Sequence, residues 1–127
     1  MSEQDKATRQ KVGLEWVEKV YGPGSSQMMA GQKGPFVEEI VEHMFGEIWS
    51  RPGLTVRERR LLVLGATTML GREDLIEIQL RGALANGEFT DEQLEELPLM
   101  MLFYAGAGNT TALVRGIQAA KAKRPAK

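Results

Sequence analysis

The sequence predicts an all-α protein, a single-domain bundle of about six helices that associates into oligomers. No segment alternates apolar and polar residues over the length of a strand, so we expect no β-sheet. Successive stretches instead repeat their apolar residues at helical spacing, and glycine or proline separates them. The chain has 127 residues, which suits one domain spanning residues 1–127.

The first predicted helix runs from a cap at Ser2 to about Tyr21. Residues 22–34 follow without periodicity and contain four glycines and one proline, so we expect a long loop there. Loops of this length in a small domain are either exposed connectors or flaps over a site. The sequence leaves both interpretations open.

The second predicted helix begins at Pro35, a favoured first-turn residue, and ends at Arg51-Pro52-Gly53. A third helix covers residues 55–70. Its apolar residues fall on almost every side, which predicts a central, buried helix that ends at Gly71.

The fourth predicted helix spans residues 72–86, and Gly87 suits the left-handed position after its end. Thr90 and Gln93 have the spacing of a capping box, which predicts the start of a fifth helix. Pro98 is expected to kink or split that helix. A last helix covers residues 109–123.

The apolar residues exceed what six short helices can bury within one chain. Residues 61–70 and 98–107 both form nearly continuous apolar stretches. A subunit interface would cover them, because large apolar patches on soluble proteins usually mark such contacts. We therefore expect a homo-oligomer.

Charge and composition exclude several classes of function. The chain has sixteen basic and seventeen acidic residues, a formal net charge of −1, which provides no general attraction for nucleic acid or an anionic membrane. No apolar run approaches the roughly 20 residues that cross a bilayer, and the polar N-terminus is not typical of a secretory signal. With no cysteine, a cytoplasmic protein without thiol chemistry is expected.

One histidine, His43, offers acid–base chemistry. Glu39 and Glu47 lie four residues before and after it, so all three share one face of a helix. A carboxylate and an imidazole at this spacing form an acid–base couple, although a polar helix face is also compatible with the pattern. We predict no metal site, because one histidine without cysteine is a poor ligand set.

Arginine and tyrosine side chains offer substrate contacts. Arg51 and Arg59 flank the junction between the second and third helices, where a guanidinium could bind a substrate carboxylate through two hydrogen bonds. Surface ion pairs are the alternative role for these arginines. Tyr104 follows an apolar run and either has a structural partner or donates to a substrate oxygen.

Taken in order, several segments resemble the carboxymuconolactone decarboxylase family. The resemblance covers roughly residues 8–118, and the stretch Gly46-Glu47-Ile48-Trp49-Ser50-Arg51-Pro52-Gly53-Leu54 is the most distinctive. The other segments that carry it are Arg59 with its apolar helix, Gly71-Arg72-Glu73, Leu80-Arg81-Gly82-Ala83, Asn86-Gly87, the Thr90 cap and Tyr104-Ala105-Gly106.

This resemblance implies an alkylhydroperoxidase D-like helical fold and a homo-trimer or homo-hexamer with sites in clefts near subunit interfaces. The namesake activity is the loss of carbon dioxide from a carboxylated lactone in aromatic-compound breakdown, and it requires no cofactor. Such a reaction needs cations that bind carboxylates and a hydrogen-bond donor to the developing dienolate oxygen. It also needs an acid that protonates the carbon from which the carboxyl group has left.

The chain departs from the family pattern at Gln79, where the decarboxylase group usually carries a histidine. Glutamine donates and accepts hydrogen bonds but does not transfer a proton near neutral pH. The peroxidase branch has a glutamate, two cysteines and a histidine at the positions of Arg60, Arg72, Leu75 and Gln79. We therefore expect no cysteine-dependent peroxidase activity.

These considerations lead to one assignment and one alternative. The chain is expected to be a cofactor-free lyase acting on a small carboxylated lactone or related oxo acid. The expected roles are proton transfer by Glu47 with His43 as a second carrier, carboxylate binding by Arg51 or Arg59, and hydrogen-bond donation by Gln79 and Tyr104. The alternative is a non-catalytic binding or scaffold oligomer that lost the histidine at position 79.

Overall fold

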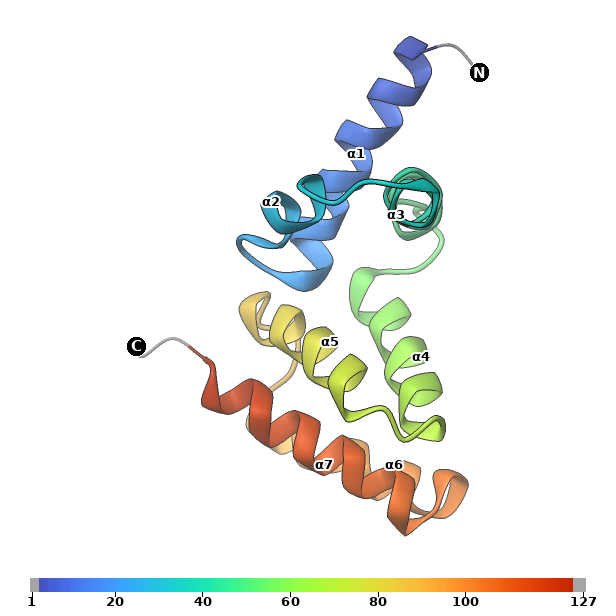
Figure 1. Ribbon diagram of the computed structural model, residues 1–127. Coiled ribbons are helices and arrows are strands. Elements are labelled where there is room, and N and C mark those ends of the chain that lie inside the picture. The colour runs from blue at the N-terminus through green and yellow to red at the C-terminus, as the bar shows by residue number, and fades with distance from the viewer. Residues whose placement is uncertain (1–2, 125–127) are drawn as a thin grey trace. The chain divides into compact units, whose positions relative to one another are not determined.

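The structure, a computed structural model that describes residues 3–124, is all-α, as the sequence predicts (Figure 1). These residues form seven α-helices and one π-helix, without a strand. The elements are α1 Glu3–Tyr21, α2 Ser25–Ala30, α3 Pro35–Glu39, η1 Ile40–Trp49, α4 Val56–Met69, α5 Glu73–Ala85, α6 Asp91–Ala105 and α7 Ala107–Ala122. The cap predicted at Ser2 lies outside the described residues.

The chain divides into two compact units, Met1–Val56 and Arg57–Lys127. The first contains α1, α2, α3 and η1, and the second contains α5, α6, α7 and all of α4 beyond its first residue. Each unit has its own packing and its own polar cluster.

In the first unit, α1 packs closely against η1. Gly13 makes this approach possible: a β-carbon there would lie 1.9 Å from the carbonyl oxygen of Val41, so only glycine fits. Phe45 of η1 is fully buried, with its ring edge-on to Tyr21 and stacked on Trp49. Burial of these rings stabilises the pair of helices.

The segment Gly22–Gly34 is not the continuous loop that the sequence predicts, because it contains α2. The carboxylate of Glu18 accepts hydrogen bonds from the backbone N–H groups of Gly24 and Ser26, both at 3.0 Å. These bonds satisfy amides at the start of α2, and they lower the pKa of Glu18. The cap comes from the preceding helix, so residues 22–34 alone do not reveal it.

The second predicted helix does begin at Pro35, but it changes character at Ile40, where α3 continues directly into the π-helix η1. Extended π-helical segments are rare, and π-helical turns often occur at functional sites. Here η1 carries His43 and Glu47.

The second unit is built around one apolar core. Helix α7 packs against both α5 and α6 (Figure 1). Gly116 of α7 lies against Ile76 of α5. The buried core residues are Leu64, Ile76, Leu80, Ala83, Phe89, Leu94, Leu113, Ile117 and Ala120. The predicted capping box is confirmed, since Thr90 and Gln93 exchange side-chain-to-backbone hydrogen bonds of 3.0 and 3.1 Å. Pro98 lies inside α6 without splitting it.

Helix α4 is not buried on all sides, so that expectation was wrong for the single chain. Leu62 is 66% exposed, and Leu70, just beyond the helix, is 69% exposed. The buried residues of α4 are Arg60, Leu64, Thr67 and Thr68, which form one stripe along the helix. On α6, Phe103 is 90% exposed. Burial of these side chains between copies of the chain stays a prediction. Within residues 3–124, no helix is long and apolar enough to cross a membrane.

Candidate functional site

A buried arginine forms the centre of a polar cluster in the second unit. The side chain of Arg60 is fully buried, and it donates to both carboxylate oxygens of Glu88, from Nε at 3.0 Å and from Nη2 at 2.7 Å. Its Nη1 donates to Oε1 of Gln79 at 3.1 Å. The cluster therefore joins α4, α5 and the segment that follows α5.

Local sequence explains how these three side chains meet. Arg60 precedes buried Leu64 by one helical turn, so it lies on the covered stripe of α4. Gly87 follows α5 with φ +66°, a conformation that favours glycine, as the sequence predicts. The chain reverses there, and the N–H of Glu88 donates to the carbonyl oxygen of Ala83 at 3.0 Å. This turn directs Glu88 back toward Arg60.

The electrostatics of Glu88 favour its charged form. Burial raises the pKa of this carboxyl group, but hydrogen bonds from Arg60 and Asn86 outweigh that effect, and the pKa lies below its ordinary value. The Asn86 side chain donates to Glu88 over 2.9 Å. The positive charge of Arg60 is thus offset by a carboxylate in direct contact with it.

Gln79 is held in one amide orientation. A guanidinium only donates hydrogen bonds, so the group facing Arg60 must be the amide oxygen of Gln79. The NH2 group then points away from Arg60. Gln79 is only 6% exposed. The arrangement provides an oriented neutral donor.

Positions 60 and 79 are those at which the peroxidase branch of the resembled family has a glutamate and a histidine. The structure brings these two positions into contact through the Arg60–Gln79 hydrogen bond. Both residue types differ here, so the pair cannot exchange a proton near neutral pH.

A second polar cluster lies between α1 and η1 in the first unit. Nδ1 of His43 lies 2.6 Å from Oε2 of Glu39, and Nε2 of His43 lies 3.2 Å from Nη1 of Arg9. Arg9 also pairs with Glu47, with Nη1 2.8 Å from Oε1. The predicted triplet Glu39, His43 and Glu47 is thus linked, with Arg9 as the bridge between its last two members.

The surroundings of His43 define its protonation. Because Arg9 can only donate, a hydrogen bond at Nε2 requires that this nitrogen carry no proton, so Nδ1–H donates to Glu39. The hydrogen bond to Glu39 raises the pKa of His43 above its ordinary value of 6.5. Protonation at Nε2 would remove the contact with Arg9.

The close approach of α1 and η1 creates this cluster. A β-carbon at Gly46 would lie 3.1 Å from the carbonyl oxygen of Arg9, and Gly13 meets Val41 one turn further along α1. Two glycines therefore bring Arg9 within reach of His43 and Glu47. Glu47 remains 42% exposed at its side chain.

The other predicted site residues are Arg51, Arg59 and Tyr104. Arg51 follows η1 and is exposed, whereas Arg59 is partly buried on α4. Tyr104 lies near the end of α6 and is 73% exposed, so it is not a buried hydroxyl within the chain. The predicted residues are thus divided, with His43, Glu47 and Arg51 in the first unit and Arg59, Gln79 and Tyr104 in the second.

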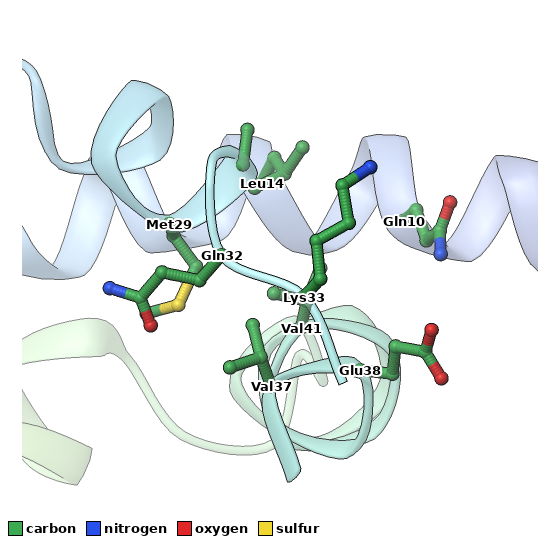
Figure 2. Close-up of a pocket in the computed structure, with 9 residues that line it drawn as sticks. Gln10, Leu14, Met29, Gln32, Lys33, Val37, Glu38 and Val41 are labelled. Carbon is green, nitrogen blue, oxygen red and sulfur yellow. The ribbon is translucent and has the colours of Figure 1, made fainter. Parts of the chain in front are cut away.

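A groove in the first unit is lined by α1, the end of α2, the α2–α3 segment and the α3–η1 helix (Figure 2). Its volume is about 180 Å³. Its lining is Gln10, Leu14, Met29, Ala30, Gln32, Lys33, Val37, Glu38 and Val41. None of the predicted site residues lines it. Among the described residues, no group of three or more histidine or acidic side chains is arranged to hold a metal ion.

Sequence reasoning did not assign roles to Arg9, Arg60 or Glu88. Arg60 could have been found from helical spacing, because it falls on the same stripe as Leu64 within an apolar helix. A charged side chain at a core position needs a partner of opposite charge, because an unpaired buried charge is costly. Arg9 carries no comparable signal, since its partner His43 is 34 residues away.

The comparisons with known proteins agree with this architecture. The chain is similar to a 4-carboxymuconolactone decarboxylase of Acinetobacter baylyi (strain ATCC 33305 / BD413 / ADP1), at 41% identity over 71 residues, which is 56% of this chain and 52% of that relative. It is also similar to the nitrosuccinic acid decarboxylase npaB of Metarhizium robertsii (strain ARSEF 23 / ATCC MYA-3075), at 33% identity over 103 residues, 80% of this chain and 66% of that relative. The chain thus spans about half to two thirds of these relatives. A family model described as the carboxymuconolactone decarboxylase family matches residues 35–119. The chain therefore belongs to the carboxymuconolactone decarboxylase family.

Proposed function

We propose that this protein is a cofactor-free lyase that removes carbon dioxide from a small carboxylated lactone or related oxo acid in aromatic-compound breakdown. Family membership and the names of two relatives, both decarboxylases, support the reaction type. The observation that carries the proposal is the oriented amide of Gln79, whose NH2 group is turned away from Arg60.

The two relatives' names share a chemical feature. Both substrates are carboxylic acids that also carry a group able to accept an electron pair, a lactone in one case and a nitro group in the other. When carbon dioxide leaves a carbon conjugated with such a group, negative charge develops on an oxygen. A fixed hydrogen-bond donor stabilises that charge, and a proton-transfer group completes the reaction at carbon.

Each predicted residue keeps a proposed role. Gln79 donates to the developing oxyanion, with Tyr104 as a second donor. Glu47 is the proposed proton-transfer group and His43 a second carrier, and their shared contact with Arg9 supports a fixed geometry for both. Arg51 or Arg59 would bind a substrate carboxylate, because a guanidinium matches a carboxylate with two parallel hydrogen bonds.

The experiment is a carbon dioxide release assay on the purified protein with 4-carboxymuconolactone and with nitrosuccinate. The proposal expects release from at least one of them and a large loss of rate in Glu47→Gln. Glu15→Gln is the matched control, since Glu15 is an exposed acid in the same unit. Absence of release from both acids, or equal rates for Glu47→Gln and wild type, would contradict the proposal.

A non-catalytic binding or scaffold oligomer is the second candidate. The observation that favours it is Gln79 itself, which replaces the usual histidine and cannot carry a proton near neutral pH. The Gln79→His substitution separates the two functions. An appearance or rise of activity supports the lyase, whereas silence of both Gln79→His and Glu47→Gln supports the scaffold.

We also propose that the protein acts in the cytoplasm as a homo-trimer or homo-hexamer. The support for the oligomer is the exposed apolar surface on α4 and α6, including Leu62 and Phe103. Light scattering coupled to size exclusion gives the particle mass directly. A monomer at micromolar concentration would contradict the oligomer.

A further inference from the structure

We infer that Arg60 is a positioning residue that, anchored by Glu88, makes Gln79 a fixed neutral donor for an oxygen that gains negative charge as carbon dioxide leaves. The inference rests on the proposed lyase function and deepens it. It adds two residues to the site, and it defines the substrate class by the group next to the departing carboxylate.

The first step is the anchoring of Arg60. Glu88 accepts from Nε and Nη2, so the guanidinium plane is fixed by two bonds to one carboxylate. Full burial of Arg60 and the 9% exposure of the Glu88 side chain limit competition from water. Nη1 is thereby held at a defined place, and it meets Gln79 there.

The second step is the orientation of Gln79. Rotation of its amide by half a turn would place NH2 against the guanidinium, with two donors facing each other. That orientation loses the 3.1 Å hydrogen bond and leaves buried groups unpaired. Arg60 therefore selects the orientation in which the NH2 group is turned away from the guanidinium.

The third step concerns charge. Glu88 stays ionised because hydrogen bonds from Arg60 and Asn86 stabilise its carboxylate, and it offsets the charge of Arg60. A ligand at Gln79 thus meets a neutral, preorganised N–H donor rather than a free cation or a titrating group. Such donors stabilise a transition state when charge develops on the oxygen they face.

The substrate class follows from the electron balance of the reaction. The bond between the carboxylate carbon and its neighbour breaks, carbon dioxide leaves, and the electron pair passes to a conjugated carbonyl or nitro oxygen as an enolate or a nitronate. Gln79 donates to that oxygen, and a proton from an acid group or water then adds to carbon. Acids without a conjugated oxygen, such as succinate, cannot delocalise the pair and are not substrates.

A double-mutant cycle tests the positioning role. Gln79→Met removes the donor, and kcat should fall by about 10²–10³-fold with little change in KM. The combined Arg60→Met, Glu88→Met variant removes the ion pair as a unit, because apolar replacement of a whole buried pair is often tolerated. When Gln79 is present, this replacement should lower kcat by about tenfold or more. When Gln79→Met is already in place, the same replacement should cause no further loss of kcat. Equal losses in both backgrounds would overturn the inference.

A second measurement is independent of activity. The side-chain NH2 resonances of Gln79, assigned by their loss in Gln79→Met, should shift in the Arg60→Met, Glu88→Met protein. They should stay unchanged when the exposed pair of Arg72 and Asp74 is replaced by methionines in the same way. Unchanged Gln79 resonances in the first variant would overturn the positioning role. A further outcome is that the wild-type protein releases no carbon dioxide while the Gln79 resonances still shift in the Arg60→Met, Glu88→Met variant. That result supports the positioning of Gln79 and contradicts only the proposed function.

Discussion

The fully buried guanidinium of Arg60 donates to both oxygens of the Glu88 carboxylate, at 3.0 and 2.7 Å. The two residues are 28 positions apart, and the pair fixes α4 to the segment after α5. Removing one partner deprives the other charge of its direct ionic contact inside the protein, which is costly.

Replacement of Arg60 alone should therefore destabilise the protein strongly. For Arg60→Met we expect a loss of about 3–5 kcal/mol in the free energy of unfolding, because the mostly buried Glu88 carboxylate loses the cation that it contacts directly. Urea denaturation followed by circular dichroism measures the loss. Arg72→Met serves as the control, since its pair with Asp74 is exposed and its removal should change stability far less. An equal loss of unfolding free energy in the two variants would show that the buried pair stabilises the protein no more than the exposed pair.

The same pair predicts how stability depends on acid. The pKa of Glu88 is lower in the folded protein than its ordinary value of 4.5, so the unfolded chain binds its proton first as the pH falls. The stability from Glu88 is thus complete above about pH 4.5 and is lost as the pH falls through the lowered pKa. The free energy of unfolding of Glu88→Gln should therefore lie below that of wild type at pH 7, and this difference should become smaller as the pH falls. A difference that stays constant from pH 7 to pH 3 would contradict the role of Glu88.

Helical spacing in the sequence predicts most of the fold. It predicts the all-α class, the start at Pro35, the capping box of Thr90 and the turn at Gly87, because each depends on residues close together in the chain. It misses α2, whose cap is Glu18 from the preceding helix. It also predicts too much burial for α4, since composition does not show how much of a helix its neighbours cover.

The candidate site is less predictable for the same physical reason. The spacing of Glu39, His43 and Glu47 predicts that they share one helix face. Arg9 reaches His43 and Glu47 only because α1 packs closely on η1 at Gly13. The family resemblance leads to Gln79, yet the partner that fixes its amide is on another helix. Contacts between helices depend on packing, which local patterns do not encode.

The single histidine provides a direct probe of the first cluster. A hydrogen bond to Glu39 raises the pKa of His43, so its imidazole should titrate above 6.5 in proton NMR. In Glu39→Gln, where the charged acceptor is lost, the pKa should fall toward 6.5. Glu38→Gln is the control, because the neighbouring Glu38 pairs with Lys6 rather than with His43. An identical His43 titration in wild type and Glu39→Gln would remove Glu39 as the cause.

Two glycine-to-alanine substitutions should have opposite effects on stability. In Gly13→Ala, the new methyl group would lie 1.9 Å from the carbonyl oxygen of Val41, so α1 and η1 must separate. Forced repacking of this kind costs about 1–3 kcal/mol. Gly65 lies inside α4 with no atom within 4 Å of an added β-carbon, and alanine there should stabilise the helix by about 0.5–1 kcal/mol.

The Gly13→Ala protein also tests how the first cluster is assembled. Separation of α1 from η1 moves Arg9 away from His43 and Glu47, so the His43 proton resonances should shift together with the loss of stability. Gly65→Ala should leave these resonances in place, because the added methyl group has no atom within 4 Å to displace. A Gly13→Ala protein with wild-type stability and an unshifted His43 signal would mean that the helix contact at Gly13 does not hold the cluster together.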